Sequence, residues 1–141
     1  MEAVRYKIIK EKALLLQQFT GNLTKQDLAE FFTELYNNPD YLLVSTIFSD
    51  FSKADVALTD EETEGVAKFI VAYAPKVRYV KNAIIVNEPL ITAYVLLYQE
   101  VMKEMPLYEC DVFSTFNEAS KYIGYDVPAL KKLISHSFSD K

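Results

Sequence analysis

The sequence predicts an α/β fold, with a mixed, mostly parallel β-sheet whose strands are joined by right-handed β-α crossovers. Short apolar, β-branched runs alternate with segments whose apolar residues recur at helical spacing, and Pro, Gly and capping residues separate them. Strands that alternate with helices form largely parallel sheets with right-handed crossovers. The predicted order is β-β-α-β-α-β-α-β-α-α, and 141 residues suit one domain spanning residues 1–141.

The first half of the chain is predicted to open with a hairpin. Apolar runs at residues 6–10 and 13–19 flank a charged turn and form antiparallel strands, the first at an edge of the sheet. Thr24, with Asp27 three positions later, caps a helix that ends before Pro39. Residues 41–48 are nearly all apolar or β-branched, which is typical of a central strand covered on both faces.

The second half continues the alternation. A polar, acidic loop over residues 49–58 leads to Thr59, which forms a capping box with Glu62 at the start of the second helix. Residues 81–86 form the next strand, and Pro89 opens the third helix. Residues 107–113 form the last strand, followed by two short helices with Gly124 as a C-cap between them.

Aromatic and aliphatic residues on the predicted inner faces define an expected core. We expect these side chains to be deeply buried: Phe31, Ile47, Phe69, Ile85 and Phe113. The helix from Leu90 to Met105 is more apolar than one sheet-facing stripe requires, and we expect its remaining apolar surface to form a homodimer.

Charge and cysteine content exclude several classes of partner. The formal net charge is −5, and no cluster of Lys and Arg offers a footprint for nucleic acid. No apolar run approaches the roughly 20 residues that span a bilayer, and the charged N-terminus does not resemble a signal peptide. Cys110 is the single cysteine, so it forms no internal disulfide, and we expect it buried and reduced in a cytoplasmic protein.

The residue types that usually carry catalysis are sparse. His136 is the only histidine, so a Ser-His-Asp or Cys-His arrangement would have to include it, yet it lies near the C-terminus, where we expect it to be solvated. No His and Cys cluster offers a metal site, and three scattered glycines cannot build a phosphate loop. We therefore expect no enzyme activity, no metal and no cofactor.

Polar residues gather where the predicted parallel strands end, which is where open α/β sheets bind ligands. The candidate binding residues are Asp50, Ser52, Asp55, Thr59, Asn87 and Ser114. The same residue types serve turns and helix caps, so the pattern fits both functions. As a binding surface, the acidic loop over residues 49–59 favours a small ligand or a basic protein partner whose affinity falls with salt and with Asp50→Asn or Asp55→Asn.

Four stretches in this order resemble the SpoIIAA-like, STAS-type family. They are Phe19-Thr20-Gly21 followed by Thr24 and Asp27; Asp50-Phe51-Ser52; residues 81–87; and Asp111-Val112-Phe113 with Glu118-Ala119 and Tyr122-Ile123-Gly124. The resemblance covers residues 6–124 and extends in outline to the lipid-binding CRAL-TRIO fold. It implies a non-catalytic regulatory or ligand- and protein-binding module. The alternative is a carrier of a small apolar or lipid-like ligand, whose lining would include Tyr94, Tyr98, Tyr73 and Phe69.

One departure from the resemblance concerns regulation. Anti-anti-sigma members of the STAS group carry an Asp-Ser-Ser-Gly cap with a phosphorylated Ser before the second helix, whereas this chain has Leu58-Thr59-Asp60-Glu61. A phosphate on Thr59 would meet repulsion from the adjacent carboxylates, partly offset by the helix N-terminus. We therefore expect Thr59 to be an N-cap, with phosphorylation as the alternative.

Overall fold

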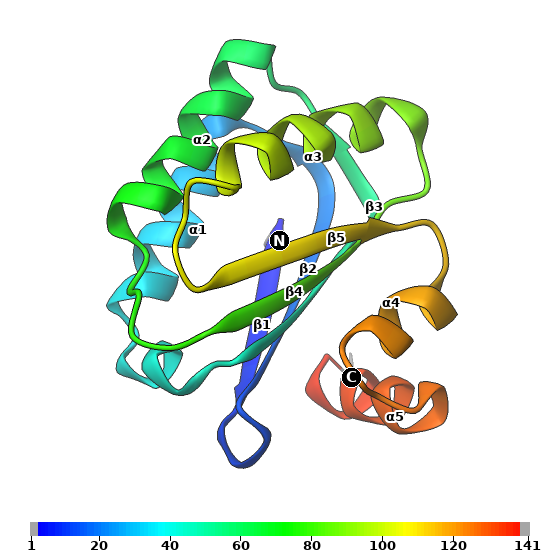
Figure 1. The fold of residues 1–141 in the computed structure, drawn as a ribbon. Coiled ribbons are helices and arrows are strands. Elements are labelled where there is room, and N and C mark those ends of the chain that lie inside the picture. The colour runs from blue at the N-terminus through cyan, green and yellow to red at the C-terminus, as the bar shows by residue number, and fades with distance from the viewer. Residues whose placement is uncertain (1–2, 139–141) are drawn as a thin grey trace.

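The computed structural model describes residues 3–138, and these form one five-stranded sheet between two unequal layers of helices (Figure 1). The strands are β1 (Val4–Ile9), β2 (Leu14–Leu23), β3 (Thr46–Val56), β4 (Val80–Ile85) and β5 (Tyr108–Phe113). The helices are α1 (Lys25–Asn37), α2 (Asp60–Tyr73), α3 (Pro89–Met102), α4 (Phe116–Tyr122) and α5 (Val127–Ser137). In the described range, no helix is both long and apolar enough to cross a membrane.

The sheet confirms the predicted topology. β1 lies antiparallel to β2 at one edge, and β2, β3, β4 and β5 follow in parallel, so the order in space equals the order in the chain. Each crossover steps in the same direction with the same hand, and this brings α1, α2 and α3 onto one face. The two helices after β5 pack on the opposite face (Figure 1).

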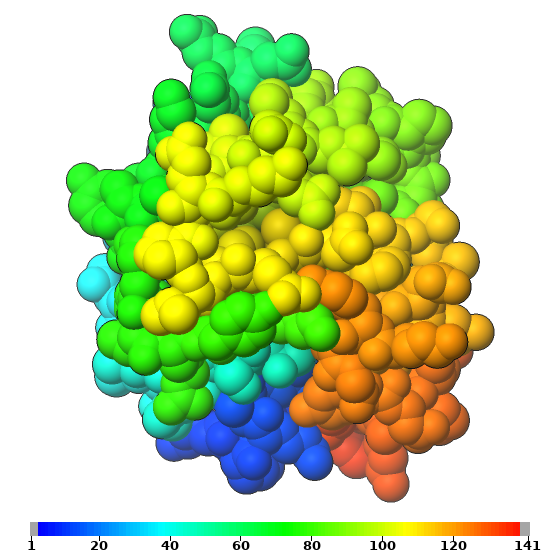
Figure 2. Space-filling view, viewed as in Figure 1, coloured from blue at the N-terminus to red at the C-terminus, as the bar shows by residue number. Residues whose placement is uncertain are grey.

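The two faces of the sheet bury two separate cores. The larger lies under α1–α3, and among its best buried members are Leu15, Phe19 and Ile91. The smaller lies under α4 and α5 and includes Leu14, Leu16 and Leu130. Alternation along β2 explains this division, because successive strand residues point to opposite faces. In Figure 2 the side chains of β5 lie beside those of α4.

The helix boundaries follow the predicted capping chemistry. Thr24 and Thr59 both form complete capping boxes, with side chains that accept from the backbone N–H of Asp27 and Glu62. After α4, Gly124 adopts a φ of 78°, a left-handed conformation that costs glycine little. These local signals placed the starts of α1 and α2 and the end of α4, whereas the helix predicted from Leu90 to Met105 ends at Met102.

The region before β3 corrects one predicted strand. Residues 41–45 were expected to begin a central strand, but Pro39–Leu43 form a short 3-10 helix and the strand begins at Thr46. Asn38 caps this turn by accepting a hydrogen bond from the backbone N–H of Asp40. The apolar run therefore forms part of a 3-10 helix and the start of a strand. Tyr41 and Val44 are buried in the core, while Leu42 and Leu43 are exposed.

The expected core residues were mostly, but not all, placed correctly. Phe31, Ile47 and Ile85 are buried as predicted. Phe69 and Phe113 are only half-buried, and so is Cys110. Cys110 and Phe113 belong to β5, which has a neighbour on one side only, and Phe69 packs beside Tyr73 at the outer side of α2. Helical periodicity identified the right stripe but not its centre.

Candidate functional site

The predicted acidic loop is mostly strand. Asp50, Ser52 and Asp55 lie on β3, which continues to Val56, and not in a loop over residues 49–58. The prediction failed because the strand is polar where it extends beyond β4: its pairing with β4 ends at Asp50, and from there it pairs only with β2. A strand that is not buried on both faces carries polar side chains on the face exposed to solvent.

A β-bulge in β3 accounts for the direction of these side chains. The pairing of β2 with β3 shifts between Gln18 and Thr20, so that Gln18 faces Asp50 while Thr20 faces Lys53. The extra residue reverses the alternation, and the Asp50 carboxylate accepts a hydrogen bond from the backbone N–H of Ser52 at 2.9 Å. At the bulge the Phe51 ring stacks on Phe19, with centroids 4.0 Å apart.

The remaining predicted site residues lie at the carboxyl ends of strands and near helix starts. Asn87 and Ser114 are exposed residues that follow the neighbouring strands β4 and β5. Thr59 is the exposed N-cap of α2. Among the described residues, Asp50 and Ser52 are the only two of the six candidates joined by a hydrogen bond. Asp50 pairs with Ile85 and Ile85 pairs with Phe113, so Asp50, Asn87 and Ser114 share the carboxyl edge of the sheet. The binding role of the six residues stays a prediction.

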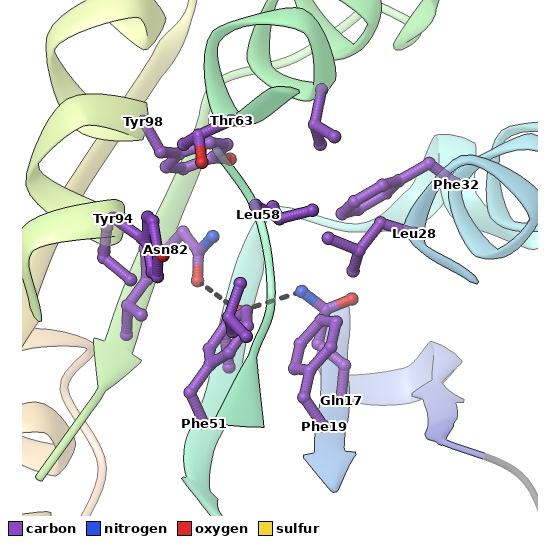
Figure 3. Close-up of a pocket in the computed structure, with 15 residues that line it drawn as sticks. Gln17, Phe19, Leu28, Phe32, Phe51, Leu58, Thr63, Asn82, Tyr94 and Tyr98 are labelled. Carbon is purple, nitrogen blue, oxygen red and sulfur yellow. Dashed lines mark hydrogen bonds between the residues drawn. The ribbon is translucent and has the colours of Figure 1, made fainter. Parts of the chain in front are cut away.

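A cavity lies instead inside the larger core, between the sheet and α1–α3 (Figure 3). It has a volume of about 70 Å³ and is partly open to solvent. Figure 3 shows Leu28 and Phe32 of α1 on one side and Tyr94 and Tyr98 of α3 on the other. Its other lining residues are Gln17, Phe19, Ser49, Phe51, Val56, Leu58, Thr63, Val66, Asn82, Ile84 and Val95.

The cavity wall is apolar, and its floor carries a ladder of polar side chains across neighbouring strands. The Gln17 Nε2 group donates to Ser49 Oγ at 2.8 Å, and Ser49 Oγ donates to Asn82 Oδ1 at 2.8 Å. Asn82 Nδ2 donates to the Tyr108 hydroxyl at 2.9 Å, and that hydroxyl lies 3.1 Å from the hydroxyl of Tyr98. We call these five side chains the polar ladder.

Three members of the ladder are buried and Tyr98 and Tyr108 are half-buried, so its hydrogen bonds are not exchanged freely for bonds to water. Gln17, Ser49 and Asn82 have exposed fractions of 5%, 1% and 4%. A buried polar group without a partner costs about 1–3 kcal/mol. Each ladder group meets a neighbour, with one exception: Gln17 Oε1 has no hydrogen-bond partner among the described residues.

Burial also fixes the charge state of the ladder. Desolvation raises the pKa of Tyr98 and of Tyr108 above the ordinary tyrosine value, because the phenolate would lose its hydration there. Desolvation likewise raises the pKa of the Cys110 thiol to about 11, although a hydrogen bond with Tyr108 acts in the opposite direction. The floor of the cavity is therefore neutral at physiological pH.

The chemistry of this floor is hydrogen bonding. The Ser49 hydroxyl contacts two carboxamides and neither an imidazole nor a carboxylate, so its partners do not include the base that a serine nucleophile needs. His136 lies exposed on α5, a helix that packs on the opposite face of the sheet. Across residues 3–138, no group of three or more His, Cys, Asp and Glu side chains is arranged to hold a metal.

The predicted lining of an apolar carrier was half right. Tyr94 and Tyr98 line the cavity. Tyr73 is 66% exposed, and Phe69 packs against it rather than on the cavity. The two pairs come from different helices, and of these two helices only α3 places its predicted aromatic residues on the cavity.

Sequence reasoning missed the polar ladder, although a signal was present. Gln17 lies two positions from both Leu15 and Phe19, and strand alternation places all three on one face. Asn82 stands in the same relation to Val80 and Ile84 on β4. A carboxamide at an inward position of an apolar strand indicates a buried polar network. The carboxamides of Gln17 and Asn82 can be assigned to one network only when β2, β3 and β4 are known to be neighbours.

Comparisons with known proteins support the fold. No protein-family model matches the chain, and no curated protein matches it in sequence. Among solved structures, an uncharacterised protein of the DUF3478 family from Shewanella loihica PV-4, described as having a SpoIIAA-like fold, is similar with a TM-score of 0.53. The two share 14% sequence identity over 87% of this chain and 95% of the other. The predicted SpoIIAA-like fold is thus confirmed.

Proposed function

We propose that this chain is a non-catalytic binding module whose cavity accepts a small, predominantly apolar ligand. The observation that carries the proposal is the partly open apolar cavity within the larger core, with a buried hydrogen-bonding floor. Binding sites for small molecules combine an apolar wall with a few placed polar groups. The proposal joins the two functions that the STAS and CRAL-TRIO resemblances imply, and gives them one location.

The size and opening of the cavity constrain its ligand. A dry engineered cavity of about 150 Å³ holds benzene or xenon, so about 70 Å³ accommodates only a small group or the end of a longer molecule. Phe32, Phe51 and Tyr94 are lining residues that remain partly exposed. They mark the open side of the cavity, from which the rest of a longer bound ligand would extend toward solvent.

Xenon tests whether the cavity accepts an apolar guest. Under xenon pressure, amide and methyl NMR resonances of the lining residues Leu28, Val66 and Val95 should shift in a saturable way. Val66→Phe should abolish these shifts, because the ring fills the space that Val66 borders. Val71→Phe is the matched control, since Val71 is half-buried on the same helix and does not line the cavity.

Native mass spectrometry then tests whether a ligand is retained. Freshly purified wild-type protein and Val71→Phe should carry a co-purifying molecule that Val66→Phe lacks. Xenon shifts spread evenly over the surface, or shifts that survive Val66→Phe, would contradict the proposal. A co-purifying mass retained equally by folded Val66→Phe would place the binding site elsewhere.

A further inference from the structure

We propose that the ligand carries a neutral hydroxyl group at its buried end, and that Gln17 Oε1 accepts a hydrogen bond from it. This inference rests on the proposed function and specifies the ligand class, an aliphatic or aromatic alcohol. Gln17 is 5% exposed and lines the cavity, and its amide oxygen is the one buried side-chain polar atom without a partner in the described residues.

The donor-to-acceptor direction of the hydrogen bonds in the polar ladder determines which ligand group the cavity can pair with. Gln17 donates to Ser49, Ser49 donates to Asn82, and Asn82 donates to Tyr108. Because the Gln17 Nε2 group donates to Ser49, the Gln17 atom left without a partner is its acceptor oxygen. A carbonyl oxygen accepts hydrogen bonds, so it pairs with an O–H group of a ligand and not with a ketone or ether oxygen.

Figure 3 shows where that acceptor lies. The Gln17 amide nitrogen points toward Ser49, and its oxygen points to the other side, toward Leu28. The neighbours of the cavity at this point are apolar side chains of the helix layer and the rings of Phe19 and Phe51. A hydroxyl placed here gains a buried partner, and its carbon chain gains an apolar wall.

The charge of the lining excludes an acid as the buried group. Lys and Arg are absent from the fifteen residues that line the cavity. A carboxylate would lose its hydration without gaining a counter-ion, and it would face the lone pairs of Gln17 Oε1. The neutral lining therefore favours an alcohol over the fatty acid of the same length.

The test uses four probes of similar size: 1-butanol, 1-fluorobutane, 2-butanone and butanoate. Dissociation constants come from NMR titration of the lining residues in the wild-type protein and in Gln17→Leu. The fluoroalkane has nearly the shape of the alcohol but no donor, so the ratio of its dissociation constant to that of the alcohol isolates the hydrogen bond. The ratio should fall on the order of fivefold in Gln17→Leu, as expected for one neutral hydrogen bond.

Gln18→Leu is the matched control. Gln18 is the next residue of β2, points to the other face and accepts a hydrogen bond from Arg5 at 2.7 Å. It should leave the alcohol-to-fluoroalkane ratio at the wild-type value. If Gln17→Leu does not fold, the wild-type protein still tests the inference, because the Gln17 side-chain amide resonances should shift with 1-butanol and not with 1-fluorobutane.

The outcomes separate this inference from the proposed function. If 1-fluorobutane binds in the cavity and the ratio is unchanged in Gln17→Leu, the hydroxyl inference is wrong while the apolar site stands. A wild-type preference for 2-butanone that Gln17→Leu removes would show that Gln17 presents its amide N–H and would also overturn the inference. If none of the four probes binds in the cavity, both the hydroxyl inference and the proposed function are wrong.

Discussion

At the scale of single residues, the polar ladder is the feature with the largest consequences for stability. Its members lie among apolar side chains, and each depends on a neighbour on the next strand or on α3. Removing Ser49 or Asn82 therefore takes one hydrogen bond from each of two neighbours, and water does not replace it easily. This dependence makes the ladder more sensitive to substitution than its small number of hydrogen bonds suggests.

Asn82→Ala should destabilise the protein by about 1–3 kcal/mol, because Ser49 loses its acceptor and Tyr108 loses a donor. Urea unfolding followed by circular dichroism measures the change. Asn22→Ala is the control, since Asn22 is exposed near the end of β2. Equal midpoints for the two variants would show that the ladder contributes little to stability.

Buried tyrosines predict how stability depends on alkaline pH. Burial raises the pKa of Tyr41 to about 12, and it raises the pKa values of Tyr98 and Tyr108 as well. The unfolded chain releases these protons near pH 10, so it then binds fewer protons than the folded chain. The stabilisation is complete below about pH 10 and is lost as pH rises toward the folded pKa values.

Tyrosinate absorbance should therefore rise in two stages, with the buried tyrosines ionising only as the protein unfolds. Tyr98→Phe should reduce the second stage. A Tyr98→Phe protein that loses absorbance in the first stage instead would contradict the burial of Tyr98.

The difference between predicted and observed site residues also has its origin at this scale. Asp50, Asp55 and Asn87 were identified because polar residues after apolar runs suggest a strand end. Gln17 and Asn82 were overlooked because each is a single polar residue within an apolar strand. Their importance comes from which strands are neighbours, and composition alone does not carry that information.

At the scale of elements, capping residues were the most reliable signal in the sequence. Thr24 and Thr59 were each predicted as N-caps and each forms a complete capping box. Such motifs are local, because the side chain and its partner lie three residues apart. The boundaries of β3 were predicted poorly, because its start depends on the packing of a 3-10 turn and its end on pairing with β2 alone.

Thr59→Ala should cost about 1 kcal/mol of stability through loss of the α2 cap. Thr33→Ala is a matched control, because Thr33 lies within α1, is exposed and returns its hydroxyl to the Ala29 carbonyl. That substitution should be nearly neutral. Thermal unfolding of both variants gives the comparison, and a Thr59→Ala protein as stable as Thr33→Ala would show that the cap is dispensable.

At the scale of the whole molecule, the sequence predicted the four parallel strands and the antiparallel edge strand, but not how the helix layers share the buried surface. The apolar helix from Leu90 to Met105 was expected to need a second subunit. Much of its apolar surface is used within the chain, since Ile91, Val95 and Met102 are buried. Leu90 and Leu96 remain exposed, at 59% and 52%.

The homodimer therefore stays a prediction that depends on a small surface. Sedimentation equilibrium should show a dimer at high micromolar concentration, and Leu96→Glu should convert it to a monomer. Leu107→Glu is the control, because Leu107 is 49% exposed but lies in the segment after α3. A wild-type protein that sediments only as a monomer would exclude this interface.

The equality of strand order and chain order has a consequence for biosynthesis. Each new β-α unit joins the edge left by the unit before it, so no strand has to insert between two that are already paired. A chain that folds from its N-terminus as it leaves the ribosome can add these units one at a time. Tyr108, the final rung beneath the cavity, arrives with β5 after α1, α2 and α3 have been synthesised. The hydrogen bonds beneath the cavity are thus complete only after β5 has been synthesised.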